Sequence, residues 1–315
     1  MILLRDIRYV RLGTRDLDAA ATFARDILGL EPAGCDTNAR YFRSDSRDHT
    51  LVYLKGEPKE HATAFELESK EALDAAAEVL EGMKREVKWG TKDGGAQRRV
   101  ESYISFNDPS GNPIELVVRP HHSGKEYFPQ RAAGITGFSH IGLRTTDPVR
   151  DEQFWTQVMN ARVSDRIGSA PLLRIDEVHH RMALFPSAYP GVQHVNHQVA
   201  GIDDLMRSYY FLKEQGVKIV FGPGRHPTSS AMFLYFEGPD GMVYEYSTGV
   251  RLIRKEEEGS YRPRQFPFEP SSFCMWGSRP DIPEFRKKSV TDTKALLGVA
   301  EISGQNGPVP PRPFP

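Results

Sequence analysis

The sequence has few cysteines, no long hydrophobic run and no excess of either charge. It contains two cysteines, Cys35 and Cys274, which lie far apart and form no metal-type pair. This usage fits a reducing compartment without structural disulfides, and both side chains are expected to be buried thiols. The first residues, MILLRDIRYV, reach Arg5 after an apolar run that is too short for the central region of a signal peptide.

Composition also bears on the partners of the protein. No stretch approaches the roughly 18 consecutive apolar residues of a membrane span, so we expect no membrane association and a cytoplasmic location. Lys and Arg number 41 against 42 Asp and Glu, which gives a formal charge of -1. Because no basic block could neutralise a phosphate backbone, nucleic acid is not an expected partner.

An internal repeat with an offset of 130 or 131 residues organises the chain. In each half, a strand with alternating apolar residues precedes an amphipathic helix, and Asp16 and Asp147 are the candidate N-caps. Later in each half, a Pro/Gly-rich turn joins two further strands. The matching segments are 7–30 with 138–161, 63–83 with 196–216, and 103–117 with 234–248.

The repeat predicts an α+β fold. We expect tandem βαβββ modules that form two curved, partly closed and mainly antiparallel sheet domains with helices on their outer side. The predicted domains are an N-terminal metal-free module (1–130), a C-terminal catalytic metal-binding module (131–252) and a Pro-rich tail (253–315). The composition of the tail is typical of disorder, but we favour a tail docked on its own body or on a neighbouring subunit.

Three side chains of metal-binding type lie on separate predicted strands of the second module. They are His140 in SHIGL, His194 in QHVNHQV and Glu245 in MVYEYST. Two histidines and one carboxylate on one face of a metal, with the remaining positions free, are the arrangement of non-haem Fe(II) oxygenases. We therefore predict that these three residues are metal ligands.

Superposing the two halves places the metal in the second one. The first half keeps one potential ligand of three, too few for a divalent ion at an open site, so its role is expected to be structural or interfacial. The equivalent pairs are His140 with Tyr9, His194 with Ala62, and Glu245 with Glu115.

Other histidines compete for the same role. His197 lies three residues beyond His194, and an odd offset on a strand points to the opposite face, so we predict a packed or surface side chain. His121 and His122 lie in the polar linker between the halves and are expected to be solvated.

The quoted motifs resemble those of a known family. SHIGLRTTD, HHRMALFP, QHVNHQVAGIDDL, GPGRHPTSSAMFLY and PDGMVYEYSTG are similar to motifs of the type I extradiol ring-cleavage dioxygenases of the vicinal oxygen chelate superfamily, such as 2,3-dihydroxybiphenyl 1,2-dioxygenases and catechol 2,3-dioxygenases. The resemblance covers about residues 5–250 and implies the vicinal oxygen chelate, or glyoxalase-like, fold. It also implies Fe(II), with Mn(II) as the other candidate, a catecholic substrate, O2 and a homo-oligomer.

The same resemblance implies roles for three residues around the metal. His180, the second histidine of HHRMALFP, would be the general acid/base, while His226 and Tyr235 would contact the hydroxyls of the substrate. Imidazole suits proton transfer at neutral pH because its unperturbed pKa is about 6.5. Thr228 stands where the biphenyl-type enzymes often have Asn, which leaves the identity of the catechol open.

The implied activity is cleavage of a catechol ring with both atoms of O2, giving a hydroxymuconate-semialdehyde-type product in aromatic compound degradation. Two other functions fit the scaffold. A glyoxalase-like metal isomerase or lyase would need the metal but not O2, and it gives the HHRM and GRH motifs no evident purpose. A metal-free drug-binding protein would have lost the ligands in both halves, whereas only the first half has lost them.

Overall fold

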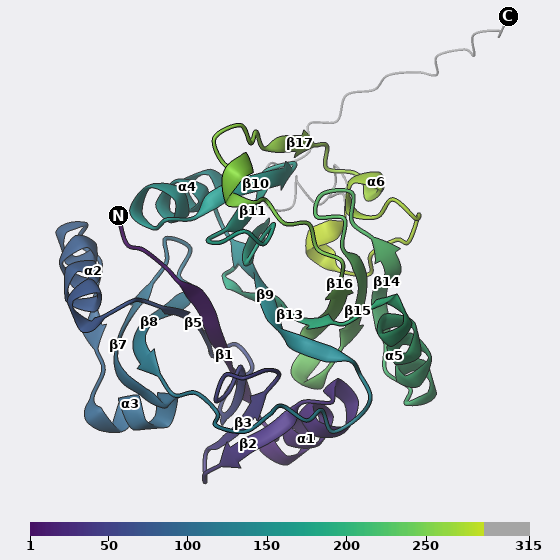
Figure 1. Ribbon diagram of the computed structural model, residues 1–315, viewed down its shortest axis with the longest axis horizontal. Helices are drawn as coiled ribbons and strands as arrows, with labels where there is room; N and C mark the ends of the chain where they lie inside the picture. Colours follow the sequence, from purple (N-terminus) through teal and green to yellow (C-terminus); the bar gives the residue numbers. More distant parts are fainter. Residues whose placement is uncertain (287–315) are drawn as a thin grey trace, which may run out of the picture.

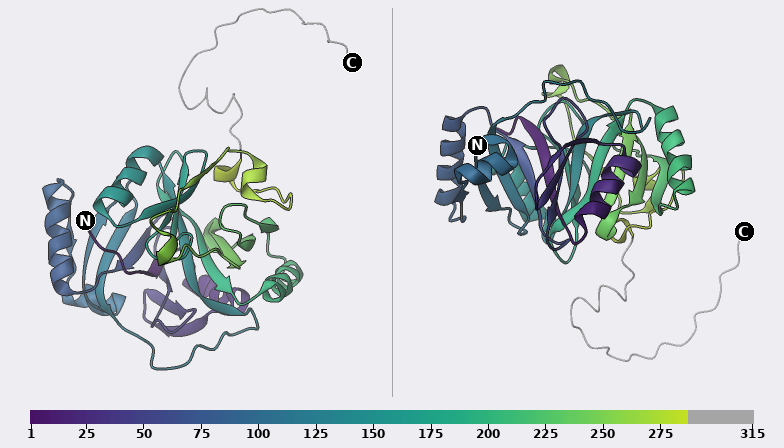
Figure 2. Two further views of the ribbon diagram at one scale, coloured as in Figure 1. Left: turned by 45° about the horizontal axis from the view of Figure 1, so that its top comes forward. Right: turned by 90° about the horizontal axis from the view of Figure 1, so that it is seen from below.

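The computed structural model describes residues 1–286, and each half of the chain forms one curved sheet (Figure 1). The strand orders are β2-β3-β4-β1-β5-β8-β7-β6 in the first sheet and β14-β15-β16-β13-β9-β12-β11-β10-β17 in the second. Helices α2 and α5 lie at opposite outer sides of the molecule, with the strands of both halves between them (Figures 1 and 2). The predicted α+β class with outer helices is confirmed.

The elements of the first half are β1 (Asp6–Thr14), α1 (Leu17–Thr22), η1 (Phe23–Leu28), β2 (Glu31–Cys35), β3 (Ala39–Arg43), β4 (Leu51–Lys55), β5 (His61–Glu66), α2 (Lys70–Gly82), β6 (Lys88–Trp89), α3 (Lys92–Arg98), β7 (Val100–Asn107) and β8 (Pro113–Pro120).

Those of the second half are β9 (Ile135–Thr145), α4 (Pro148–Gln153), η2 (Phe154–Val158), β10 (Arg162–Ile167), β11 (Ala170–Arg174), β12 (Met182–Pro186), β13 (Gly191–Val199), α5 (Ile202–Glu214), β14 (Ile219–Arg225), β15 (Met232–Glu237), η3 (Pro239–Gly241) and β16 (Val243–Thr248). The tail adds η4 (Lys255–Glu257), β17 (Arg264–Phe266), α6 (Pro270–Phe273) and η5 (Pro283–Phe285).

Each half contains a shorter repeat that the sequence comparison missed. The first and last strands of every βαβββ unit pair in parallel, as β1–β4, β5–β8, β9–β12 and β13–β16. Antiparallel pairs β1–β5 and β9–β13 then join two units into one sheet. An offset of 130 residues compares whole halves, so it cannot detect a repeat of half that length.

Local signals in the sequence start the helices where predicted. The Asp16 carboxylate accepts from the backbone N–H groups of Asp18 and Ala19, and Asp147 accepts from the backbone N–H of Arg150. Both aspartates are therefore N-caps, because their side chains satisfy N–H groups that have no partner within the helix.

The two halves share one hydrophobic core. A single cluster of buried side chains contains residues of both sheets. Phe65 of β5 and Trp155 of η2 pack with ring centroids 5.5 Å apart, and the hydroxyl of Tyr246 on β16 donates to the carbonyl of Leu28 at 2.7 Å. The boundaries at residues 130 and 252 thus mark a sequence repeat, and independent folding of the predicted domains stays a prediction.

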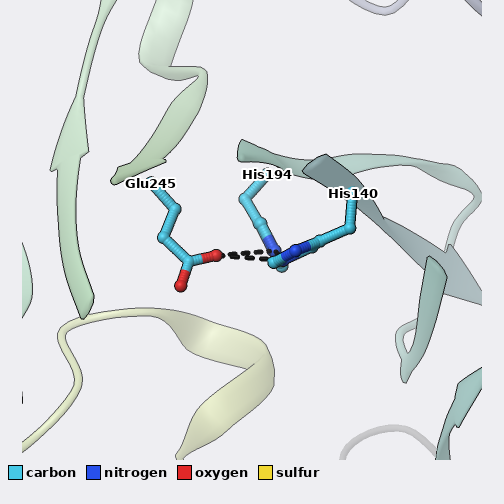
Figure 3. Close-up of side chains that lie close together, drawn as sticks. All are labelled: His140, His194 and Glu245. Carbon is cyan, nitrogen blue, oxygen red and sulfur yellow. Dashed lines mark hydrogen bonds and ion pairs between the residues drawn. The ribbon is translucent and has the colours of Figure 1, made fainter. Parts of the chain in front are cut away.

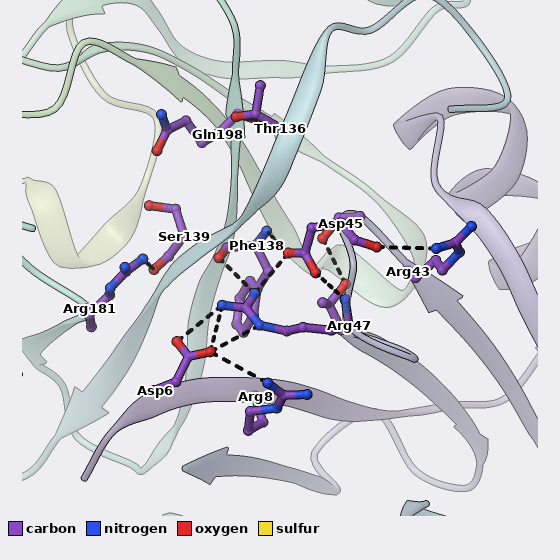
Figure 4. Close-up of polar contacts among 12 residues, drawn as sticks. Asp6, Arg8, Arg43, Asp45, Arg47, Thr136, Phe138, Ser139, Arg181 and Gln198 are labelled. Atoms are coloured by element: carbon purple, nitrogen blue, oxygen red, sulfur yellow. Dashed lines mark hydrogen bonds and ion pairs between the residues drawn. The ribbon is translucent and has the colours of Figure 1, made fainter. Parts of the chain in front are cut away.

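Polar contacts reinforce the same interface (Figure 4). Arg47 lies between Asp6 and Asp45, at 2.8 Å from a carboxylate oxygen of each, and donates to the carbonyl of Phe138 at 3.2 Å. The carboxylate of Asp45 accepts from the backbone N–H of Phe138 at 3.1 Å. These contacts hold the turn after β3 against strand β9, which carries His140.

The described part of the tail is docked on the second sheet. β17 pairs in parallel with β10, and Phe273, Ile282 and Phe285 are buried in a second hydrophobic cluster. The expectation of a docked tail is confirmed for residues 253–286, and residues 287–315 lie outside the described part. Within residues 1–286, no helix is long and apolar enough to cross a membrane.

The structure confirms one expectation about side-chain exposure and half of another. His121 and His122 are exposed, as predicted for the linker. The prediction of two buried thiols is right for Cys274 and wrong for Cys35, which is exposed. Cys35 ends β2, an edge strand of the first sheet, so no further strand among the described residues pairs beside it.

Replacing Trp155 tests the shared core. Its side chain is fully buried, so Trp155→Ala should lower the free energy of unfolding by about 3–5 kcal/mol. Guanidinium chloride denaturation measures this value. The control is Trp276→Ala, because Trp276 is 52% exposed and its loss should cost at most about 0.5 kcal/mol. Equal effects of the two substitutions would contradict a core that depends on Trp155.

Candidate metal centre

Three adjacent strands of the second sheet carry the predicted ligands. β9 carries His140, β13 carries His194 and β16 carries Glu245, and the three strands are neighbours in the order β16-β13-β9. Asn196 on the central strand is the register partner of both His140 and Glu245, which places these two at one level of the sheet. Side chains from separate parts of the chain thereby converge on one point.

A glycine opposite the central histidine makes room for its ring. Gly142 on β9 pairs with His194, and a Cβ added at Gly142 would lie 2.4 Å from the Nδ1 of His194. No side chain fits at that distance. The Oε1 of Gln193 accepts a hydrogen bond from the same Nδ1, so the Nε2 lone pair of His194 points toward the other ligands.

The distances among the three ligand atoms match one face of an octahedron (Figure 3). The Nε2 of His140 lies 3.0 Å from the Nε2 of His194 and 3.0 Å from the Oε2 of Glu245. The Nε2 of His194 and the Oε2 of Glu245 are 3.3 Å apart. Ligand atoms bound at about 2.1 Å and at right angles to each other lie about 3.0 Å apart, which agrees with these separations.

The charge of Glu245 requires a partner of opposite charge. Its carboxylate is 1% exposed, and neither oxygen has a hydrogen-bond partner among the described residues, although imidazole nitrogens face it at ion-pair distance. Burial alone would raise the pKa of Glu245, but His140 and the neighbouring histidines hold it well below its usual range. Because an uncompensated buried carboxylate is costly, a cation at this point fits the site.

The neighbouring imidazole is in the form that a metal needs. Burial lowers the pKa of His140 to about 4, so its ring is neutral near pH 7 and keeps a lone pair on one nitrogen. His140, His194 and Glu245 form the one group among residues 1–286 whose ligand atoms converge as a metal site requires.

The three residues predicted around the metal lie in the same site. The ring of His180 is 4.3 Å from that of His140, measured between centroids. The Nε2 of His226 lies 3.3 Å from the hydroxyl of Tyr235 and 3.6 Å from the Oε1 of Glu245. Structure thus brings all the predicted site residues together, while their roles stay predictions.

A small cavity of about 20 Å³ is lined by two of the three predicted ligands, His140 and His194. Its polar lining is formed by the site histidines, Tyr235, Thr228 and Ser229. The apolar lining comes from the second sheet and from the tail, and consists of Ile167, Leu172, Ala183, Phe185, Phe273 and Phe285. The tail is therefore part of the wall of the site, which the sequence had not indicated.

His197 stays outside the metal-type group, as its position on the strand predicts. It is fully buried, its ring lies 6.1 Å from that of Phe138, and both ring nitrogens lack a hydrogen-bond partner among the described residues. Burial lowers its pKa to about 4, so the ring is neutral and packs as an apolar group.

The first half satisfies its retained carboxylate without a metal. Glu115 accepts from the hydroxyl of Tyr9 at 2.7 Å, and its other oxygen lies 2.6 Å from the guanidinium of Arg98 and 3.3 Å from that of Arg11. Tyr9 occupies the position that His140 holds in the second half, as the superposition predicts. A fixed positive side chain compensates this carboxylate, which supports the structural role expected for the first half.

Three residues were not predicted from the sequence: Asp165 and His179 next to His180, and His49, the counterpart of His180 in the first half. His49 lies 4.8 Å from Tyr9 in the first half, much as His180 lies beside His140, and the repeat offset could have revealed it. Asp165 and His179 form a hydrogen-bonded pair behind His180. No pattern in the sequence points to Asp165, because a loop and a strand separate it from His179.

A comparison with known protein families shows to which superfamily this chain belongs. The model of the Glyoxalase/Bleomycin resistance protein/Dioxygenase superfamily matches residues 6–116 and 137–246. The chain belongs to this superfamily. The two matched segments coincide with the two halves found by the internal repeat, so each half carries the features of the superfamily.

Relatives within the superfamily include ring-cleaving enzymes. An iron-dependent extradiol dioxygenase of Rhodococcus jostii (strain RHA1) is 27% identical over 303 residues, which cover 87% of this chain and 96% of that one. A biphenyl-2,3-diol 1,2-dioxygenase of Paraburkholderia xenovorans (strain LB400) is 27% identical over 269 residues, 79% of this chain and 89% of the relative.

Solved structures share the fold. A halotolerant catechol dioxygenase superposes with a TM-score of 0.80 at 22% identity, covering 91% of this chain and 98% of that one. The Mn(II)-bound glyoxalase of Novosphingobium aromaticivorans superposes with a TM-score of 0.80 at 27% identity, covering 92% and 96%. The predicted vicinal oxygen chelate fold is therefore confirmed.

Equivalent substitutions in the two halves test the metal centre. Glu245→Gln should weaken the binding of a divalent metal by more than about 100-fold, because it removes a charged ligand and not only a supporting contact. Titration of the purified protein with Fe(II) under anaerobic conditions measures this loss. The fold should persist, as judged by circular dichroism.

Glu115→Gln is the matched control in the first half. It should leave metal binding unchanged and lower the free energy of unfolding by about 3 kcal/mol, because Arg98 loses its buried partner. Loss of metal in this variant, or its retention in Glu245→Gln, would contradict the assignment of the metal to the second half.

Proposed function

We propose that this protein is an extradiol dioxygenase that cleaves the ring of a catechol-type substrate with O2 at an Fe(II) centre held by His140, His194 and Glu245. The observation that carries the proposal is the separation of 3.0–3.3 Å among the Nε2 atoms of His140 and His194 and the Oε2 of Glu245. The carboxylate of Glu245 is buried and has no hydrogen-bond partner within residues 1–286. Such a facial set leaves the opposite positions of the metal open for substrate and O2. The names of the ring-cleaving relatives support this choice.

The chain supplies binding and proton transfer around the metal. When bound, the metal would act as a Lewis acid and carry electrons between the organic substrate and O2. His180 would accept the proton of a catechol hydroxyl, because it is the remaining imidazole beside His140 in the cavity wall. Burial lowers the pKa of His180 well below its ordinary value, so its ring is neutral and able to accept.

Tyr235 and His226 would orient the substrate. The carbonyl of Phe273 in the tail accepts from the Nδ1 of His226 at 2.8 Å, so this nitrogen carries a proton while the Nε2 faces the Tyr235 hydroxyl. Burial and the charge of Glu245 raise the pKa of Tyr235 well above 10, and its hydroxyl remains a donor. A substrate hydroxyl or its oxygen anion could then be held between these two groups.

The apolar wall would keep water away from the reacting atoms. A cavity of about 20 Å³ holds about one water molecule, so a catechol ring enters only when side chains of the wall move. Phe273 lies in α6 and Phe285 in η5, outside the strands of the sheet, whereas Phe185 lies on β12. We propose that these two tail residues make room for the ring and then cover it.

Iron is the proposed metal, since the facial set of two histidines and one carboxylate is typical of Fe(II) oxygenases. Manganese takes the same ligands, and a manganese-dependent 2,3-dihydroxybiphenyl 1,2-dioxygenase of Geobacillus genomosp. 3 is 26% identical over 270 residues. Removal of the metal by a chelator should abolish oxygen uptake, and anaerobic Fe(II) should restore it. Equal restoration by Mn(II) alone would assign manganese.

A second candidate is a metal isomerase of the glyoxalase type. It is favoured by the similarity of the Mn(II)-bound glyoxalase, at 27% identity over most of both chains. Such an enzyme needs the metal but no O2. A screen of substituted catechols, read by oxygen consumption and by the yellow ring-opened product, separates it from the dioxygenase. Isomerisation of a thiohemiacetal without oxygen uptake would favour the second candidate.

The metal-free drug-binding alternative fits less well, because the converging group of His140, His194 and Glu245 is complete in the second half.

Homo-oligomerisation stays a prediction, and size-exclusion chromatography with light scattering measures it. A monomer at working concentrations would contradict it.

His180→Ala tests the proton-transfer role. Turnover should fall about 10²- to 10⁴-fold, the usual contribution of a positioned acid or base, while bound iron remains unchanged. Oxygen consumption with a saturating catechol measures turnover, and His122→Ala is the control because His122 is exposed in the linker. Full activity of His180→Ala would rule out its proposed role.

A further inference from the structure

A buried chain of polar side chains leads from β10 to His180. The Oδ2 of Asp165 lies 2.9 Å from the Nε2 of His179, and the Nδ1 of His179 lies 3.1 Å from the Nδ1 of His180. Asp165 and His179 are fully buried, and His180 is 5% exposed. Neither Asp165 nor His179 lines the cavity, and the hydrogen bonds from this pair reach the cavity wall at His180.

The charge of Asp165 fixes the direction of these hydrogen bonds. Burial would raise the pKa of Asp165, but hydrogen bonds from His179 and Arg264 lower it below its ordinary value, so the carboxylate is ionised and can only accept. Burial lowers the pKa of His179, whose ring is therefore neutral near pH 7. Its single proton must lie on Nε2, facing Asp165, which makes its Nδ1 an acceptor.

The same argument applies to His180, the next residue in the chain. Since the Nδ1 of His179 accepts, the Nδ1 of His180 must donate, and the single proton of a neutral His180 ring lies on that atom. The Nε2 of His180 is then a lone pair. Because the side chain lines the cavity, this lone pair is the one available to a bound substrate.

We propose that Asp165 and His179 are positioning residues that hold the proton of His180 on Nδ1 and thereby keep its Nε2 ready to accept the proton of a substrate hydroxyl. This inference rests on the proposed function. Proton transfer breaks the O–H bond, leaves the electron pair on the oxygen and forms the Nε2–H bond of His180. The resulting imidazolium keeps its hydrogen bond to His179, and the carboxylate of Asp165 stabilises the positive charge.

The tail closes this chain from the other side. The guanidinium of Arg264 on β17 lies 2.6 Å from the Oδ2 of Asp165, and the backbone N–H of Arg264 donates to the Oδ1 at 2.9 Å. Both carboxylate oxygens are thus engaged, which leaves Asp165 one orientation toward His179. The guanidinium also donates to the carbonyl of Thr228 and so ties β17 to the loop that carries Ser229 and Thr228.

The first half supports this reading by contrast. Its counterpart of His180 is His49, and the preceding residue, Asp48, lies directly on the Nδ1 of His49 at 3.1 Å. In the second half, His179 stands at the position of Asp48 and contacts the Nδ1 of His180. The carboxylate of Asp165 contacts His179 in turn. Both halves therefore place an acceptor on this Nδ1, while only the second has a converging metal-type group in front of the ring.

Asp165→Asn in the iron-loaded enzyme tests the proposal. An amide can donate to His179, which allows the opposite proton placement and takes the lone pair away from the Nε2 of His180. We expect kcat with a simple catechol to fall about 10²- to 10⁴-fold, as in a serine protease whose orienting aspartate becomes asparagine, with KM and iron content unchanged. With 4-nitrocatechol, whose hydroxyl ionises more easily, the loss should be at least tenfold smaller.

The control for a displaced tail is Arg264→Met. It removes the ion pair between β17 and Asp165 but keeps the carboxylate on His179, so its loss of kcat should be at least tenfold smaller than that of Asp165→Asn. His179→Phe fills the same space without a hydrogen bond and should repeat the Asp165→Asn pattern with both substrates. This variant also serves if Asp165→Asn does not fold.

The outcomes separate the two proposals. Wild-type kcat in Asp165→Asn and His179→Phe, equal losses with both substrates, or an equal loss in Arg264→Met would overturn the positioning role. Absence of oxygen uptake by the iron-loaded wild-type protein with every catechol tested would instead overturn the proposed function.

Discussion

A buried carboxylate that needs a positive partner is the constraint around which both halves of this protein are built. Burial of an uncompensated negative charge is expensive, so the position tolerates a glutamate only together with a cation. In the first half, Arg98 and Arg11 supply the positive charge from the chain itself. In the second half, the imidazoles of His140 and His194 stand beside Glu245, and a metal ion would supply the charge while leaving room for substrate and oxygen.

The pairing of the strands fixes the positions of the three candidate ligands. Parallel pairing of β13 with β16 and antiparallel pairing of β13 with β9 bring these three strands side by side, so that residues far apart in sequence face one point. A shared hydrophobic core and the contacts of Arg47 hold the first half against strand β9. The first half therefore serves the site mechanically, since the position of β9 determines the position of His140.

Beyond the ligands, hydrogen bonds decide what each imidazole can do. Gln193 directs the lone pair of His194 toward the metal position, and the carbonyl of Phe273 fixes the proton of His226 on the far side of its ring. In our proposal, Asp165 and His179 likewise fix which ring nitrogen of His180 carries the proton. Two of these arrangements depend on the tail, through Phe273 and Arg264, so the segment after β16 belongs to the candidate site.

The sequence by itself determined the duplication, the α+β class, the helix starts at Asp16 and Asp147, and the candidate ligands, because these follow from local periodicity and from residue types at repeated positions. It also predicted the metal in the second half, since a comparison of equivalent positions needs no coordinates. Only the tertiary structure decided that Arg98 compensates the charge of Glu115 in the first half, that Cys35 is exposed on an edge strand, and that Asp165 contacts His179. These facts depend on contacts between segments distant along the chain, and neither hydrophobic pattern nor spacing encodes such contacts.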